Sequence, residues 1–453
     1  MKFAARSPLA FAREWGCLAD FSDCQYKILW WKGNFRADFP SGSIRIVSGF
    51  AEKEGRDGRM TVIYSALHLL VDGMCALAMF GRLLPGGDRG LSILVYNFCA
   101  FALQMPLGVA LDALCVGKKG READFPFLFV LAGVLCTVGG AFLHPAVLGI
   151  GNALFHVGGG VGTIREDDRE GWQGRGLGVF VAPGALGLYL GTILGRGGSW
   201  QIWAFGTGLL MALLCAGAIC GWRAHRFGML GRKAHRFEVS GGEGGTGRSP
   251  GSGAGESGRK ADWRAEAPSS KSNPQRTEKR AAGNAGQGIR NIAIAAVCCM
   301  LVVILRSYVG MAVAFPWKSG FRAGLLAVLM VVGGKVAGGF ASARYGLRKS
   351  TVVSLGLAGI CYLCSAAMLP GLAALFLFNM TMPITLYWLA RSMPRMPGFA
   401  FGLLTFSLFL GFLPTYFGVA AAVDGPVLGC VGSMLSMVLL MAGWRRRNES
   451  LSD

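Results

Sequence analysis

Charged residues are scarce in this sequence. Asp, Glu, Lys and Arg make up 15% of its 453 residues, whereas hydrophobic residues make up 53%. This balance excludes an ordinary soluble protein. The net charge is +20, but the basic residues lie in connections and tails, not in a patch suited to phosphate. We therefore predict a polytopic protein that has the lipid bilayer as its partner and does not bind nucleic acid.

The sequence also lacks short motifs that mark several classes of enzyme. It has no Gly-x-x-x-x-Gly-Lys-Ser/Thr stretch between a strand and a helix, so we do not expect nucleotide hydrolysis to drive it. Its 13 Cys show no metal-like grouping, and their positions in apolar runs indicate small apolar side chains rather than a disulfide framework. We expect no catalytic residues, no metal and no cofactor.

Long apolar runs are what the sequence has in abundance. A helix of about 20 residues crosses the ~30 Å hydrocarbon core of a bilayer. Six runs of suitable length cover 61–80, 91–111, 125–143, 145–162, 177–194 and 202–221. Six more cover 292–315, 323–343, 351–369, 372–390, 398–422 and 426–443. The predicted fold class is an all-α membrane protein with 12 transmembrane helices in two six-helix bundles.

A polar segment separates the two sets of runs. Residues 223–290 contain GGEGGTGRSPGSGAGESGRK and further basic, Ser, Pro and Asn residues, a composition that cannot bury enough apolar surface to fold alone. We predict a solvated basic linker there, between bundles at 61–222 and 291–445. Residues 446–453 form a tail. Residues 1–60 are either a loose extension or upstream sequence translated from an early start codon.

The placement of Lys and Arg predicts the orientation. The short connections on one side carry more of these residues, including Lys118, Arg165, Arg344 and Arg391. Cytoplasmic connections carry the excess of positive charge in membrane proteins. We expect a multi-pass protein of the cell membrane, with both termini and the linker in the cytoplasm.

A weak internal repeat relates the two halves. Gly108-Val-Ala-Leu-Asp112 followed by Gly117 and Lys118 corresponds, at a constant offset, to Gly339-Phe-Ala-Ser-Ala343-Arg344-Tyr-Gly346-Leu-Arg348. Pro183 with Gly187 corresponds to Pro414 with Gly418 at the same offset. Parallel repeats of six spans are a transporter architecture, with the substrate site between the halves.

These motifs resemble the major facilitator superfamily. The resemblance covers roughly residues 61–445 and includes the Gly-x-x-x-Asp pattern after the second span, although Ala343 replaces the Asp in the second copy. Gly178-Val-Phe-Val-Ala182-Pro183-Gly184 is similar to the fifth-span motif of drug–proton antiporters. Leu154-Phe155-His156 and Leu305-Arg306-Ser307 look like exporters of the fosmidomycin-resistance type, with Val157 where that type favours Pro.

The resemblance implies gating roles for residues in the repeated motif and in the fifth span. For Asp112 it implies a contact that latches the outward-open state, with the start of the eleventh span near Pro397 and Gly398 as its partner. Pro183 and Gly184 either bend a moving helix or only allow close packing. The gating residues expected from these motifs are Gly108, Asp112, Gly117, Lys118, Gly339, Arg344, Gly346, Arg348, Pro183 and Gly184.

Ionisable residues near the middle of a span are costly and tend to mark a pathway. His68 and Asp72 are four residues apart in the first span, so they share a helix face and can hydrogen-bond. A carboxylate beside an imidazole can change protonation near neutral pH. The pair is either a proton-coupling site or a polar pair that fixes helix packing.

Arg306 lies at a similar depth in the seventh span. An Arg there is always charged and can bind a carboxylate or phosphonate with two hydrogen bonds. We expect Arg306 to bind an anionic substrate and to meet Asp72 at the centre of a cavity, a purely structural role being the alternative.

Other polar residues in the spans could line such a cavity. His156 and Asn152 share a face of the fourth span and form either cavity wall or a packing pair. Lys335 either faces the cavity or extends toward the membrane surface. The remaining candidates for substrate binding are Gln104, Tyr189 and Asn379.

The function expected from these features is secondary active transport. The substrate would be a small, anionic molecule or drug, exported by alternating access in exchange for protons, by a monomer that is not an enzyme. Two alternatives remain: a receptor that signals through the basic linker, and a membrane enzyme acting on lipid.

Overall fold

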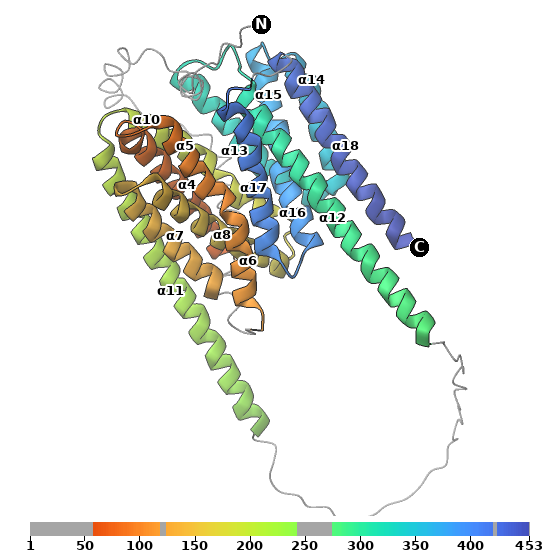
Figure 1. Ribbon diagram of the computed structural model, residues 1–453. Coiled ribbons are helices and arrows are strands. Elements are labelled where there is room, and N and C mark those ends of the chain that lie inside the picture. Colours follow the sequence, from red (N-terminus) through yellow and green to blue (C-terminus); the bar gives the residue numbers. More distant parts are fainter. Residues whose placement is uncertain (1–57, 118–123, 242–273, 420–423, 453) are drawn as a thin grey trace, which may run out of the picture. The chain divides into compact units, whose positions relative to one another are not determined.

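The computed structural model describes residues 58–117, 124–241, 274–419 and 424–452. Over these ranges the chain is helical and contains no strand. Within these ranges the chain divides into two compact units, one of the described residues between 58 and 215 and between 291 and 452, and the other of those between 216 and 290. The first unit contains most of the helices, which are labelled in Figure 1.

Six spans precede the polar segment, and several contain more than one helical element. The elements are α4 (Arg59–Ala78) with η1 (Met79–Leu83); α5 (Arg89–Asn97) with η2 (Phe98–Ala102) and α6 (Gln104–Cys115); α7 (Asp124–Phe142); α8 (Pro145–Glu170); α9 (Arg175–Val181) with α10 (Pro183–Arg196); and α11 (Trp200–Gly241).

Six further spans follow it. They are α12 (Pro274–Ala312), α13 (Gly320–Tyr345), α14 (Leu347–Leu363), α15 (Met368–Asn379) with α16 (Thr381–Ser392), α17 (Pro397–Tyr416) and α18 (Gly425–Ser452). Among the described residues, eleven helical segments are long and apolar enough to cross a membrane. Helix α14, which matches the predicted span 351–369, is 17 residues long, at the short end of the spanning range. The predicted all-α class is confirmed.

The helices on either side of the predicted linker extend into its range. Helix α11 continues to Gly241 and helix α12 begins at Pro274, so both ends of the predicted linker 223–290 are helical. Residues 223–241 contain three Gly but no Pro, and about half of them are good helix formers such as Ala, Arg, Met, Leu and Lys. Residues of this kind extend an existing helix at little cost, because the costly step is nucleation. The Gly-rich stretch lies in 242–273, outside the described residues.

The fifth span is broken where the sequence places its proline. Helix α9 ends at Val181 and α10 begins at Pro183. Proline has no N–H to donate to the preceding turn, and its ring clashes with the carbonyl group there. The break frees backbone carbonyl oxygens inside the bundle, which must find other donors in a membrane.

Close contacts between glycines join the two halves of the first unit. At one end of the spans, Gly108 of α6 lies against Gly398 of α17, and a Cβ on either residue would collide with the other's backbone. Gly339 of α13 lies against Gly174 and Gly178 of the first half, and a Cβ at Gly339 would collide with the backbone oxygen of Gly174. Small residues at such crossings let helix backbones approach closely in a membrane. Gly108 and Gly339, which the repeat relates, therefore each contact a glycine of the opposite half.

We expect a large side chain at Gly339 to destabilise this junction. Gly339→Leu would force its side chain into Gly174 and Gly178, and overpacking of this kind costs about 1–3 kcal/mol. The melting temperature of the protein in detergent should fall. Gly356→Leu is the matched control, because a Cβ at Gly356 meets nothing within 4 Å. Equal melting temperatures for the two variants would contradict this packing.

Candidate functional site

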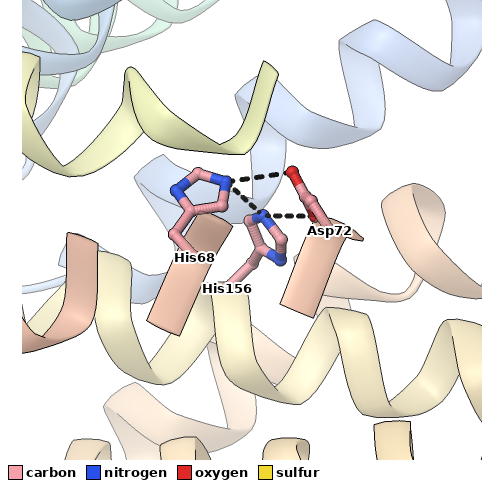
Figure 2. Close-up of side chains that lie close together, drawn as sticks. All are labelled: His68, Asp72 and His156. Carbon is pink, nitrogen blue, oxygen red and sulfur yellow. Dashed lines mark hydrogen bonds and ion pairs between the residues drawn. The ribbon is translucent and has the colours of Figure 1, made fainter. Parts of the chain in front are cut away.

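Helices α4 and α8 bring three ionisable side chains together inside the first half (Figure 2). Asp72 lies 3.2 Å from His68 Nε2 through its Oδ2 and 3.6 Å from His156 Nε2 through its Oδ1. Asn152 donates a hydrogen bond of 2.9 Å to Asp72 Oδ1. The two histidines are buried. We call His68, Asp72 and His156 the imidazole cluster.

The other nitrogen of each imidazole is held by a backbone carbonyl group. His68 Nδ1 lies 2.7 Å from the oxygen of Phe180, and His156 Nδ1 lies 2.8 Å from the oxygen of Asn152. A carbonyl oxygen only accepts hydrogen bonds. Both Nδ1 atoms must therefore carry hydrogen. In a neutral imidazole, Nε2 then carries no hydrogen and has a free lone pair.

The two Nε2 atoms nevertheless lie 2.9 Å apart. Two lone pairs at that distance, beside a carboxylate, would repel one another, whereas a hydrogen bond has this length. One Nε2 must carry a further hydrogen that the other accepts. The geometry therefore fits an imidazole pair with one extra proton, whose positive charge is balanced by Asp72.

A metal ion is the other cation that could sit among these atoms. His68, Asp72 and His156 each offer one ligand atom, all within 4.8 Å of one another. Nitrogen ligands about 2.0–2.1 Å from a tetrahedral zinc would be roughly 3.3 Å apart. The separation of 2.9 Å between the two Nε2 atoms fits a shared proton better.

The break in the fifth span supplies two acceptors beside the cluster. His68 binds the oxygen of Phe180, and the ammonium group of Lys335 donates a hydrogen bond of 3.1 Å to the oxygen of Val181. Both carbonyl groups belong to the turn before Pro183. Lys335 is on α13, so it joins the second half of the protein to this turn of the first.

Gly184 provides the space that the cluster occupies. A Cβ at this position would collide with His68 Nε2 and Asp72 Oδ2. The sequence motifs predicted gating roles for Pro183 and Gly184 but no connection to His68 and Asp72. The structure places Gly184 against the imidazole cluster and Pro183 next to the carbonyl groups that hold His68 and Lys335.

Arg306 borders a separate small cavity between the halves. The cavity is about 30 Å³ in volume, which is room for roughly two water molecules. Its wall is mostly apolar and includes two Thr; the lining residues are Val181, Val303, Arg306, Met382, Thr385, Leu386, Phe401, Leu404, Thr405 and Leu408. A substrate larger than water needs a conformational change to enter.

The expected contact between Arg306 and Asp72 is not present in this structure. Among the described residues, Arg306 forms no ion pair, and its buried Nε has no hydrogen-bond partner. Asp72 is engaged by the two histidines and Asn152 of its own half. The charge of Asp72 is thus balanced within its own half. The prediction rested on the similar depths of Asp72 and Arg306 in their spans, and depth alone does not identify the partner of a side chain.

The structure gives the remaining substrate-binding candidates different surroundings. His156 belongs to the imidazole cluster rather than to the Arg306 cavity. Gln104 and Asn379 each donate to a carbonyl oxygen of their own helix, at Ala100 and Leu375. None of these three side chains lines that cavity.

Two tyrosines join the halves at the end of the spans opposite Asp112. Tyr189 donates a 2.8 Å hydrogen bond to the oxygen of Phe321 at the start of α13. Tyr416 similarly bonds the oxygen of Gly90 across the halves, at 3.1 Å. Tyr189, which was predicted from sequence to bind substrate, therefore lies at a closure between α10 and α13.

The contact predicted for Asp112 is present. Its carboxylate accepts hydrogen bonds of 2.9 Å from the N–H of Gly398 and 2.8 Å from that of Phe399. These N–H groups are in the first turn of α17, where backbone donors lack partners within the helix and negative charge is favoured. The gating role of this contact remains a prediction.

The other residues of the repeated motif have more peripheral positions. Gly117 and Gly346 have positive φ angles of 73° and 84° just after α6 and α13. Arg348 donates to the oxygen of Trp444 at 3.2 Å. Arg344 is exposed, and Lys118 lies outside the described residues.

Sequence reasoning missed a group of acidic residues at the end of α8. Glu166 accepts a hydrogen bond from Thr61 of α4, and Asp167 accepts from the N–H groups of Gly174 and Gly176 at 2.7 and 2.9 Å. Asp168 lies 3.6 Å from Arg391 of α16. The predicted span ended at 162 because the next residues are polar. The run REDDRE was the available signal, since acidic residues that continue a membrane helix need partners.

We expect a methyl group at Gly184 to disturb the imidazole cluster. Gly184→Ala should lower the free energy of unfolding by about 1–3 kcal/mol through overpacking. In a His68→Ala background the cost should fall, because the clashing ring is gone and only the contact with Asp72 remains. Melting curves of the four proteins of this double-mutant cycle provide the measurement. Gly139→Ala is the control, since a Cβ there meets nothing within 4 Å. The same cost in both backgrounds would show that Gly184 does not accommodate the cluster.

Comparisons with known proteins identify the fold. No family model matches the chain, and no curated protein matches it. The human organic anion transporter MFSD10 is similar in structure, with a TM-score of 0.54 and 14% identity over 86% of this chain and 100% of that one. Two structures of the fucose:proton symporter FucP, one a variant of the E. coli protein, have TM-scores of 0.47 at 10% and 11% identity. They cover 86% and 85% of this chain and 98% and 99% of theirs. The chain has the fold of a major facilitator superfamily transporter.

Proposed function

We propose that this chain is a proton-coupled secondary transporter of the major facilitator superfamily that exports a small anionic molecule from the cell. The observation that carries the proposal is the imidazole cluster. It is buried in the first half, and its hydrogen bonds require one proton more than two neutral imidazoles possess. A buried site that stores a proton beside a carboxylate is what coupling to a proton gradient needs.

Loss of the shared proton would change the structure around it. The two Nε2 lone pairs and the Asp72 carboxylate would then repel one another in a medium of low dielectric constant. His68 is fastened to Phe180 at the break of the fifth span, so separation of the rings would move that break. The proton would in this way control the position of α9 and α10.

Other charged and titratable groups face the cluster and would influence its protonation. Lys335 of α13 interacts electrostatically with both Asp72 and Arg306. Tyr96 of α5 and Cys75 of α4 also interact electrostatically with Asp72. A positive charge at Lys335 opposes an extra proton on the imidazoles, so the proton site responds to the second half of the protein.

The halves are in contact at both ends of the spans, as alternating access requires of an intermediate state. At one end Asp112 binds Gly398 and Phe399. At the other, Tyr189 and Tyr416 bind the carbonyl oxygens of Phe321 and Gly90. The cavity between these closures is too small for an organic substrate. We infer that this conformation is an occluded state, from which each of the two closures opens in turn.

Arg306 is the group we propose to bind the substrate. It borders the cavity between the halves and has no anionic partner among the described residues. A buried guanidinium without a partner is costly, and a bound anion would relieve that cost. The transporter of similar fold whose name specifies organic anions agrees with this proposal. The export direction and the cytoplasmic termini rest on the sequence features alone.

We expect Asp72→Asn to abolish coupling to protons. The carboxylate that balances the extra proton is lost, so an imposed pH gradient should drive transport at least about tenfold more slowly than in the wild type. The measurement is proton flux in proteoliposomes containing a pH-sensitive dye, with succinate, butyrate, benzoate and phenylphosphonate offered as substrates.

Asp88→Asn is the matched control for this experiment. Asp88 is exposed and caps α5, where it accepts from the N–H of Leu91 at 3.1 Å, so its substitution should leave proton flux unchanged. An Asp72→Asn protein that couples as well as the Asp88→Asn protein would refute a proton-coupling role for the cluster.

A further inference from the structure

Two cations of the second half approach the same cavity without an acidic partner. Arg306 of α12 lines the cavity, and Val181 lines it too. The oxygen of Val181 accepts a hydrogen bond from Lys335 of α13. Within the described ranges neither Arg306 nor Lys335 has a carboxylate within ion-pair distance. The two positive charges act on each other electrostatically.

The described residues of the first half do not supply a charge that neutralises both. Asp72 also interacts electrostatically with Lys335, but its oxygens are engaged by His68, His156 and Asn152. When the imidazole pair carries its extra proton, Asp72 balances that proton. Two positive charges then remain at the depth of the cavity, which is an expensive arrangement inside a membrane protein.

The hydrogen bond of Lys335 leaves most of its binding capacity unused. An ammonium group has three donors, and in the part of the chain that the structure describes Lys335 uses one, toward a neutral carbonyl group. That carbonyl group is available because the fifth span breaks at Pro183. Lys335 could exchange this acceptor for an anionic one in the adjacent cavity as the cavity opens.

The cavity wall indicates what else the ligand must have. Besides Arg306, it consists of Thr385, Thr405 and apolar residues such as Val303, Phe401 and Leu404. Apolar walls suit a hydrocarbon body, while a few polar groups fix its orientation. An inorganic ion would leave these walls unused.

We propose that Lys335 is a second anion-binding residue beside Arg306, and that the site takes a small organic dianion. This inference rests on the proposed transport function and names the substrate class of its site. One charge of the ligand meets the guanidinium and the other meets the ammonium group. Binding of the dianion removes Lys335 from Val181 and so releases the second half from the broken turn of the first.

The test compares matched anions that differ in charge. The probes are succinate against butyrate and phenylphosphonate against benzoate, at a pH above the second ionisation of each dianion. Their dissociation constants for the purified full-length protein are obtained from the rise in melting temperature with ligand concentration. The wild type should bind each dianion at least roughly tenfold more tightly than its partner monoanion.

Substitutions of Lys335 test whether this residue causes the preference for dianions. Lys335→Gln and Lys335→Met should bind both members of a pair within about twofold of each other, with the affinity for the monoanion kept. Arg306→Gln should weaken both members, and Lys335→Arg should keep the preference. Lys349→Gln is the control that removes a positive charge from an exposed position. The melting temperature of each variant without anion shows whether it is folded.

Several results would overturn the proposal. They are equal affinity of the wild type for dianion and monoanion in both pairs, no binding of either dianion, or a preference that survives in folded Lys335→Gln and Lys335→Met proteins. The experiment measures binding alone, so it is separate from proton coupling. If dianions bind with this preference while Asp72→Asn still couples normally, the coupling role of the cluster fails and the anion site stands.

Discussion

The contact between the two imidazole Nε2 atoms, 2.9 Å apart, is the interaction on which the proposed chemistry depends. It gains its meaning from the opposite side of each ring, where a backbone carbonyl group fixes a hydrogen on Nδ1. With both outer positions committed, the inner position must hold a cation or the rings must separate. Asp72 balances that cation and Asn152 orients Asp72. The cluster is therefore stable in one protonation state and strained in the other, which is the property that a coupling site requires.

The proline break connects this cluster to the rest of the protein. Pro183 frees the preceding turn from regular helical hydrogen bonding, and that turn receives one side chain from each half: His68 from α4 and Lys335 from α13. Gly184 keeps the next position free of a side chain so that the cluster can lie against it. The fifth span thus touches the proton site and carries one wall residue of the cavity, Val181. A movement of this turn would displace groups of both sites directly, without a chain of intervening residues.

Much of this arrangement could be predicted from sequence because it depends on local patterns. Apolar runs predicted the helices, and the spacing of His68 and Asp72 predicted a shared face. The contact of Asp112 with α17 joins distant segments, and it was implied by the family resemblance rather than by a local pattern. What failed was pairing between distant segments. Nothing in the spacing of residues brings His156 to His68 or Lys335 to Val181, because these contacts depend on how α8 and α13 pack. The prediction that Arg306 meets Asp72 failed for the same reason: equal depth in two helices does not make their side chains neighbours.

The distribution of charge then suggests how two sites in one small volume can be coupled without touching. In the proposed protonated state, the first half holds a proton whose charge Asp72 balances. Arg306 and Lys335 of the second half have no acidic partner among the described residues. Among the described residues, Asp72 is the only nearby negative charge that could compensate Lys335. Protonation of the cluster neutralises that charge and so makes binding of an anion more favourable. Loss of the proton restores that negative charge and lowers the affinity for an anion. Because linkage is reciprocal, a bound anion would in turn favour the protonated cluster. Electrostatics alone would thus load proton and anion together, as in symport. Export driven by an inward proton gradient requires in addition that the cluster release its proton inside before the anion-loaded site opens to the outside.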